Sequence, residues 1–249
     1  MKLYRIGLIL AFVFSVQPIF AQYTVRYTTN DDVRLFQTFF EDAALTDVTY
    51  GEGFFNFSDY DFFSSVNLGV QGGIPLSDNF ELGLGWGFLS INPENGDGRS
   101  GLDNVSVFGK QHMASGRTQI SAGGFITLPI GSDNVGGDNF DFGGFAALRH
   151  PFSPGLTVTG NAGLVFRDAG GHDASLRIGG GGVIYQTSPQ LNIIGELNLE
   201  TQGDVGLLSG GIDYVTGGNG HIRSVLGLGI DNGAPDILIQ FSYLVFFSR

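Results

Sequence analysis

The sequence predicts an all-β fold, an antiparallel transmembrane β-barrel of about twelve strands, from three observations. Between Phe62 and Phe247, runs of 10 to 13 residues alternate apolar with small or polar residues, and each run ends in a Gly, Asn, Asp or Pro turn. This period of two is the strand period. The runs are about twice as long as ordinary soluble strands, and they have the length that crosses a bilayer.

The segment Leu191–Thr201 shows the pattern best. Leu191, Ile193, Gly195, Leu197 and Leu199 share one face, and the opposite face carries Asn and Glu side chains. An apolar face toward lipid and a polar face toward the lumen are what a transmembrane barrel requires. Residues after the N-terminal segment contain no apolar run of the ~18 residues that a spanning helix needs. A membrane form must then be a closed barrel, because hydrocarbon tolerates no unpaired strand edge.

The chain is expected to begin with a signal peptide over residues 1–21. Lys2 and Arg5 give it a basic start, and Ile6–Val16 is an apolar run of signal-peptide length, with Ala21 as the last residue before cleavage. Residues 22–46 form a separate N-terminal segment, and residues 47–249 form the barrel. The outer membrane of a Gram-negative bacterium is the expected location.

Charge and composition exclude several classes of function. Without Lys2 and Arg5 the chain keeps 10 basic and 24 acidic residues, a net charge of −14, which argues against nucleic acid as a partner. The absence of cysteine excludes disulfides, thiolate metal sites and a cysteine nucleophile. We expect no cofactor and no metal, and we expect a monomer whose partners are outer-membrane lipid and a small-molecule solute.

Each predicted strand is an alternating run between two turn signals. In Phe80–Ile91, for example, Phe80, Leu82, Leu84, Trp86 and Phe88 fall on one face. The twelve predicted strands are Asp47–Phe57, Phe62–Gly73, Phe80–Ile91, Leu102–Met113, Thr118–Leu128, Phe140–His150, Leu156–Phe166, Ala174–Gln186, Leu191–Thr201, Asp204–Val215, His221–Ile230 and Asp236–Phe247.

The connections between these strands predict the orientation of the barrel. Those after Gly73, Met113, His150, Gln186 and Val215 are short, whereas most of the others are longer and more polar. Short periplasmic turns and longer outer loops are typical of outer-membrane barrels. An even number of strands then leaves both termini in the periplasm.

Residues 22–46 have two interpretations. Asp31 and Asp32 would cap a short helix in which Val33, Phe36 and Phe40 lie near helical spacing, and this helix would plug the lumen or lie at the periplasmic mouth. Alternatively, Tyr23–Thr28 and Val33–Phe40 form a hairpin that raises the count to fourteen strands. The helix is the slightly favoured interpretation.

Several short motifs resemble a known family. Leu102–Lys110 (LDNVSVFGK), Gly123–Asp133 (GGFITLPIGSD), Ile74–Leu84 (IPLSDNFELGL) and Pro235–Tyr243 are similar to segments of the MetA-pathway phenol-degradation or transporter-like outer-membrane proteins. Ile130 stands where that family usually has Thr. The resemblance covers roughly Phe62 to Phe247. It implies a barrel that moves small hydrophobic or aromatic compounds, and it supplies no catalytic residues.

The candidate functional residues are charged side chains on the predicted inward face. An Arg or Lys on the lipid face costs about 2–4 kcal/mol at mid-bilayer, so these charges must point inward. Two interpretations stay open. The charges form a constriction of positive and negative side chains that selects solutes, or they form ion pairs that link neighbouring strands and close the lumen. The candidates are Lys110, Arg149, Arg177, Arg223, Glu81, Glu196, Glu200 and Asp213, with Asp141 on the same face.

The sequence therefore predicts a passive channel for small solutes, with three rivals. An outer-membrane lipase needs a Ser/His pair, but no G-x-S-x-G motif is present and the four histidines fall in separate predicted ends, loops and turns. A structural barrel with a closed lumen is the second rival, and a soluble secreted sandwich is the third. We expect no enzymatic activity.

Overall fold

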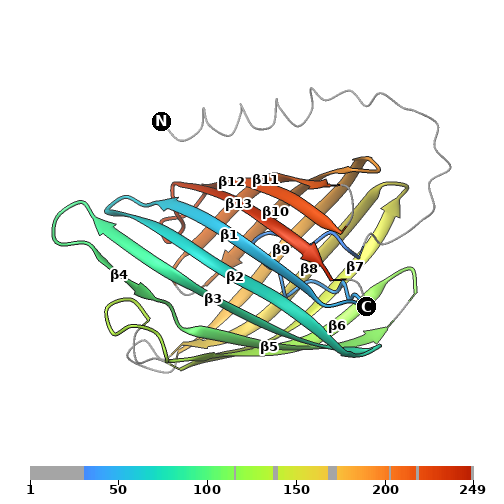
Figure 1. The fold of residues 1–249 in the computed structure, drawn as a ribbon, viewed down its shortest axis with the longest axis horizontal. Helices are drawn as coiled ribbons and strands as arrows, with labels where there is room; N and C mark the ends of the chain where they lie inside the picture. The colour runs from blue at the N-terminus through green and yellow to red at the C-terminus, as the bar shows by residue number, and fades with distance from the viewer. Residues whose placement is uncertain are drawn as a thin grey trace.

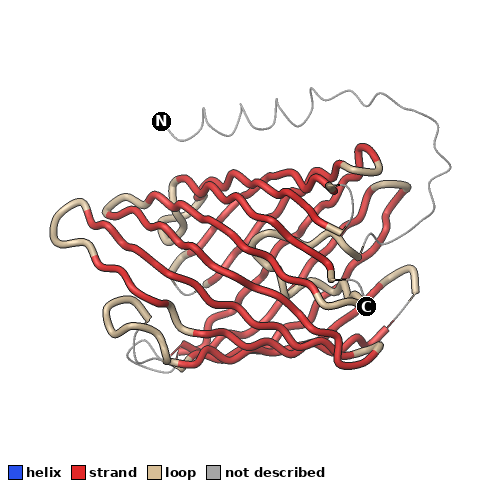
Figure 2. Tube along the Cα trace, in the orientation of Figure 1, coloured by secondary structure: helices blue, strands red, loops and turns tan. Residues whose placement is uncertain are grey.

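The computed structural model describes residues 31–114, 116–136, 140–167, 173–201, 203–216 and 219–247, and these residues form one antiparallel sheet of strands joined by turns and loops (Figures 1 and 2). The signal peptide predicted over residues 1–21 lies outside them. The strands are β1 Tyr50–Asp59, β2 Phe63–Ser77, β3 Phe80–Pro93, β4 Arg99–Leu102, β5 Val105–Ala114, β6 Gln119–Leu128, β7 Asp141–Ser153, β8 Leu156–Arg167, β9 Asp173–Ser188, β10 Leu191–Glu200, β11 Val205–Val215, β12 Gly220–Gly229 and β13 Ile237–Phe246.

The sheet closes on itself because β1 pairs with both β2 and β13. Tyr50 lies opposite Gly73 on one side and opposite Phe246 on the other. Twelve strands form the ring, and the short β4 pairs with the outer end of β3 beside it. The predicted barrel of twelve strands is confirmed, and the soluble sandwich of two sheets is wrong.

Alternation places apolar side chains outside and polar ones inside, as β10 illustrates. Ile193, Leu197 and Leu199 are exposed, whereas Asn192 and Glu196 are almost fully buried. Leu82, Leu84, Trp86 and Phe88 of β3 are exposed in the same way. An apolar band of this kind on a closed barrel is the surface that meets lipid.

The two ends of the barrel differ in their connections (Figure 2). At one end the turns are tight, as between Ser77 and Phe80 or between Ser153 and Leu156, where Gly155 takes a φ of 76°. At the other end the loops after β3 and β6 are longer. The chain enters β1 and leaves β13 at the end with tight turns, so the predicted alternation of short and long connections is present.

Residues 31–46 lie inside the barrel as an irregular segment, which we call the plug. The helix favoured for this segment is wrong, and so is a strand over Val33–Phe40, because residues 31–46 contain only turns, bends and irregular backbone. A helix or a strand would satisfy the backbone N–H and C=O groups of this segment through regular backbone hydrogen bonds. Here inward side chains of the wall do so instead, and the plug has one internal backbone bond, from Glu41 N to Thr38 O at 3.0 Å. Tyr23–Thr28 fall outside the described residues.

The barrel interior is packed around the plug. Val33, Leu35 and Phe36 form a buried cluster with wall residues such as Ile184, Ile194 and Val225. Phe39 and Phe40 form a second cluster with Tyr50, Leu244 and Phe246. Among the described residues, no helix is long and apolar enough to cross a membrane.

Candidate functional site

All eight predicted lumen residues belong to strands and face the barrel interior. Arg177 is half-buried, and the other seven are buried. Asp141, on the same predicted face, lies half-buried at the first residue of β7. The structure brings the eight residues together in small groups, and plug residues join most of these groups.

The first group centres on Glu81 of β3, which lies opposite Lys110 of β5 in the ladder. Its carboxylate is 3.4 Å from Lys110 Nζ and 3.5 Å from Arg34 Nη2 of the plug. The Tyr50 hydroxyl donates to Glu81 Oε1 at 2.6 Å. Lys110 Nζ also donates to the carbonyls of Asp42 and Ala44, at 3.1 and 2.6 Å. One carboxylate thus joins two wall strands to the plug.

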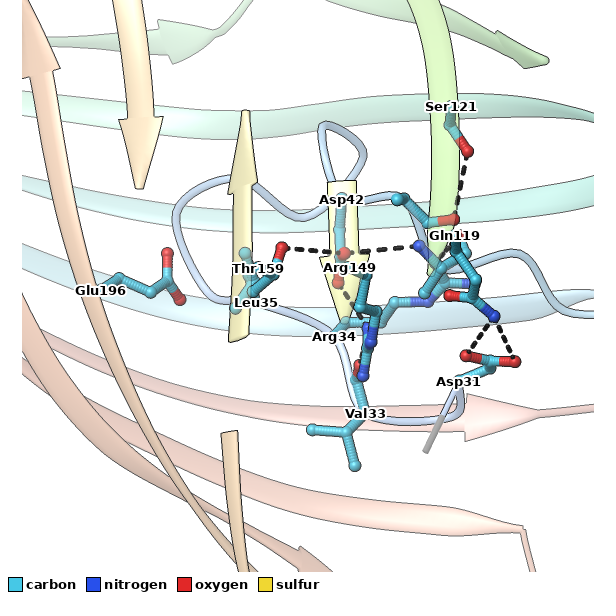
Figure 3. A network of polar contacts seen from close by, with 12 residues as sticks. Asp31, Val33, Arg34, Leu35, Asp42, Gln119, Ser121, Arg149, Thr159 and Glu196 are labelled. Atoms are coloured by element: carbon cyan, nitrogen blue, oxygen red, sulfur yellow. Dashed lines mark hydrogen bonds and ion pairs between the residues drawn. The ribbon is translucent and has the colours of Figure 1, made fainter. Parts of the chain in front are cut away.

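The second group centres on Asp42 of the plug (Figure 3). Arg149 of β7 places Nη1 2.6 Å from Asp42 Oδ2 and donates from the same nitrogen to the Val33 carbonyl at 3.1 Å. Thr159 of β8 donates to Asp42 Oδ1 at 3.2 Å. The side chains of Asp42 and Arg149 are fully buried. This pair holds the plug against the wall of β7 and β8.

The third group centres on Arg223 of β12. It pairs with Glu52 of β1, and its Nε lies 3.2 Å from Asp213 Oδ2 on the neighbouring strand β11. Arg223 also donates to the plug carbonyls of Arg34 and Leu35. Its guanidinium stacks over the ring of Phe36, 4.5 Å from the ring centroid, which adds a cation–π contact.

Glu196 of β10 binds the plug backbone directly. Its carboxylate accepts from the backbone N–H of Phe36, and from that of Gln37 at 3.1 Å. Because a carboxylate that accepts two backbone N–H groups is well stabilised, this contact fixes the bend of the plug that carries Leu35 and Phe36.

The fourth group lies toward the outer loops. Arg177 of β9 pairs with Glu200 of β10 at 3.3 Å and with Glu41 of the plug at 2.6 Å. Arg167 at the end of β8 also donates to both carboxylate oxygens of Glu200, at 2.9 and 3.0 Å. The plug is therefore held by charged side chains on several sides of the barrel.

The sequence interpretation missed the residues that the plug contributes, above all Arg34, Glu41 and Asp42, together with Glu52 and Tyr50 of β1. The available signal was the presence of three charges in a stretch of about a dozen residues that is otherwise mostly apolar. The sequence does not reveal the partners of these three charges, because each partner lies at least 40 residues away in the chain. Six of the eight predicted inward charges pair across neighbouring strands, as Glu81 with Lys110, Arg177 with Glu200 and Arg223 with Asp213, whereas Arg149 and Glu196 contact the plug.

Two of the described histidines contact an Asp or Ser side chain that also binds another group. His221 Nδ1 lies 2.7 Å from Asp213 Oδ1, but that aspartate is also paired with Arg223. His112 Nδ1 lies 3.4 Å from Ser121 Oγ, and this hydroxyl donates to the plug carbonyl of Ala43 at 3.1 Å. No group of three or more His, Cys, Asp or Glu suited to a metal ion is present in the described part of the chain.

Comparison with solved structures places this geometry among known barrels. An outer membrane channel from Pseudomonas putida F1 is similar with a TM-score of 0.66 and 14% identity, over 83% of this chain and 98% of that one. The NanC porin gives a TM-score of 0.57 at 12% identity, over 81% of this chain and 100% of that one. The fold is that of outer-membrane channels.

A third similar structure is the toluene transporter TbuX from Ralstonia pickettii. Its TM-score is 0.53 at 9% identity, over 83% of this chain and 91% of that one. No family model matches the chain, and no curated protein matches it. These neighbours are channels, porins and transporters rather than enzymes.

Proposed function

We propose that this protein is a passive channel for small solutes in the outer membrane of a Gram-negative bacterium, with the plug as its gate. The observation that carries the proposal is the plug itself. Residues 31–46 fill the lumen but belong to no strand, and charged side chains hold them rather than a continuous ladder. Such a segment is able to shift while the barrel wall stays closed.

The membrane location is supported by the outer surface. Exposed apolar side chains occur on the strands around the ring, among them Leu68, Trp86, Ile126, Leu164 and Phe241. In water such a continuous apolar band would be unfavourable, whereas in a bilayer it is required. Outer-membrane lipid is thus the expected partner, and the protein acts as a monomer without nucleic acid, cofactor or enzymatic activity.

Hydrophobic or aromatic compounds are the favoured solutes. Phe108 and Phe125 are half-buried on the inner wall, with ring centroids 5.6 Å apart, and Phe40 of the plug stacks on Phe108 at 4.5 Å. The resemblance of several motifs to the MetA-pathway transporter-like family supports this solute class. A toluene transporter and a monoaromatic hydrocarbon channel are among the structurally similar barrels.

Planar-bilayer conductance with a lockable plug tests the gate. The chain has no cysteine, so Ala43→Cys with Ser121→Cys, at a site where Ser121 Oγ bonds the Ala43 carbonyl, introduces a single disulfide. We expect conductance steps in the reduced protein and their loss on oxidation. The single variant Ser121→Cys controls for the oxidant. Equal conductance in both redox states would mean that the plug is not the gate.

A structural barrel with a permanently closed lumen is the second candidate, and the packed plug favours it. The same measurement separates the two. A closed barrel gives no conductance steps above background in either redox state, and deletion of its gene leaves solute uptake unchanged.

A further inference from the structure

Strands β2 and β3 extend toward the outer end of the barrel, where the longer loops lie (Figure 1). Their ladder continues to Phe63 opposite Pro93. Past its last pair with β5, β3 pairs with the short β4, whose Arg99 lies opposite Ile91. The three strands therefore form a platform that carries the loop between β1 and β2 and the loop between β3 and β4.

A cavity of about 570 Å³ lies between these two loops, and this volume is in the range of roughly 300–1,000 Å³ that is typical of small-molecule sites. Its walls are formed by Phe62, Phe63, Ile91 and Pro93, and polar residues complete its edge. Ile91 and Pro93 lie an even number of residues after Glu81, whose side chain faces the interior. Because side chains alternate along a strand, the cavity is on the lumen side of the platform, at the outer mouth.

Contacts between the two loops hold the walls of the cavity in place. The backbone N–H of Glu94 donates to the Phe62 carbonyl at 2.9 Å, and that of Tyr60 donates to the Phe63 carbonyl at 2.9 Å. The Tyr60 ring stacks on the Phe63 ring, with the centroids 4.3 Å apart. In the loop between β3 and β4, Gly96 takes a φ of 125°, which glycine adopts without strain. A ligand would therefore have to order little of the chain when it binds.

The exposure of Phe62 points to an apolar ligand. Its side chain is 77% exposed, and it lies in a loop rather than on a lipid-facing strand. Asp61 precedes it, and Glu94 and Asp97 line the same cavity, and all three are exposed, so this part of the chain lies in water. A large apolar side chain held at the wall of a cavity in water is stabilised when an apolar ligand covers it.

The charges at the edge of the cavity do not favour a charged ligand. Glu94, Asp97 and Arg99 carry both signs and are exposed, so water screens them. The walls supply two phenyl rings, and an aromatic ligand gains from ring–ring contact in addition to the apolar area that it buries. We propose that this cavity binds small neutral aromatic compounds before they enter the lumen, an inference that rests on the channel function proposed above and names its first binding site.

A local reporter tests binding without requiring transport. The chain has no cysteine, so Asn95→Cys, in the lining of the cavity, carries a trifluoromethyl tag at a single position. Phenol is the probe, and the ¹⁹F chemical shift of the full-length protein in detergent is followed. The same tag at Asp78→Cys, in the exposed turn between β2 and β3, controls for effects on the detergent. We expect a saturable shift for the first tag alone. No shift there, or equal shifts for both tags, would overturn the proposal.

Three further probes of similar size define the class of ligand. Benzoate and benzylammonium are charged aromatic compounds, and cyclohexanol is a neutral compound without an aromatic ring. We expect phenol to bind more tightly than each of them. Tighter binding of benzoate that is lost in Arg99→Gln would assign the cavity to organic anions, and tighter binding of benzylammonium would assign it to organic cations. Either result, or equal affinity for cyclohexanol, would overturn the proposal.

Phenylalanine variants then locate the binding site. Phe62→Ala, combined with the tagged Asn95→Cys, removes one wall of the cavity, so phenol should bind about tenfold more weakly. Phe152→Ala is the matched control, because Phe152 is 69% exposed and lies at the opposite end of the barrel. Heat-modifiable gel migration verifies that each variant folds. Unchanged affinity in Phe62→Ala, or equal losses in the two variants, would contradict the site.

The channel function fails separately, by an absence of conductance in the wild-type protein. Binding without conductance would therefore retain the cavity and reject the channel, whereas conductance without binding would reject the cavity alone.

Discussion

The guanidinium of Arg149 lies 2.6 Å from the carboxylate of Asp42, a residue 107 positions earlier in the chain. Both side chains are fully buried inside the barrel. Removing one partner of such a pair leaves the other charge buried and unpaired, at a cost of about 3–5 kcal/mol. The pair therefore holds the plug more firmly than an exposed ion pair would.

Asp42→Asn should release the plug. Arg149 would lose its charged partner while the barrel wall keeps its ladder, so the plug moves rather than the strands. We expect more frequent or larger conductance steps in planar bilayers. Asp61→Asn, in the exposed loop between β1 and β2, is the control and should behave as wild type. Unchanged conductance in Asp42→Asn would show that this pair does not restrain the plug.

Glu81→Gln should weaken both the wall and the plug, because Glu81 is paired with Lys110 and with Arg34. We expect a loss of about 3–5 kcal/mol in the free energy of unfolding, measured by denaturant titration of the heat-modifiable gel shift. The double variant with Lys110→Met should recover part of this loss, since coupled neighbours are not additive. If the losses in the free energy of unfolding of the two single variants simply add in the double variant, Glu81 and Lys110 are not coupled, and Glu81 is not the centre of this group.

Adjacent substitutions on β10 test the two faces of the wall. Leu197 is 36% exposed toward the lipid side, and Asn198 faces the lumen. Leu197→Arg should cost about 2–4 kcal/mol near mid-bilayer and reduce the fraction of assembled barrel. Asn198→Arg should reduce it less, because its charge reaches a polar interior. Equal assembly of the two variants would mean that the inner and outer faces are wrongly assigned.

The wall was predictable from the sequence because a strand that separates lipid from a polar lumen must alternate at every residue. For β3 and β10 the predicted and observed bounds differ by at most two residues. Two predicted strands differ from those observed. β2 extends to Ser77, beyond the predicted end at Gly73, because Pro75 is accommodated at a register shift beside Ser77. The predicted strand Leu102–Met113 is divided, since Leu102 ends β4 and β5 begins at Val105.

The plug was not predictable in the same way. The identities of the inward wall charges follow from alternation, and all eight candidates face the interior. Their partners do not follow, because an irregular segment has no period that relates Asp42 to Arg149 or Glu41 to Arg177. Helical spacing of Val33, Phe36 and Phe40 reflected packing against different parts of the wall rather than one helix face.

A glycine substitution tests whether side-chain packing retains the plug, independently of its ion pairs. A Cβ on Gly83 would lie 2.3 Å from the ring of Phe40, whereas a Cβ on Gly85, two residues along the same inward face of β3, would meet only Gln71 at 3.9 Å. Gly83→Ala should therefore displace Phe40 from its place beside Phe108 and loosen the plug without altering a charge. We expect faster protease cleavage within residues 31–46 of the folded barrel, and Gly85→Ala should be cut at the wild-type rate. If the two variants are cut equally, steric contact at Phe40 does not retain the plug, and the buried ion pairs alone hold it.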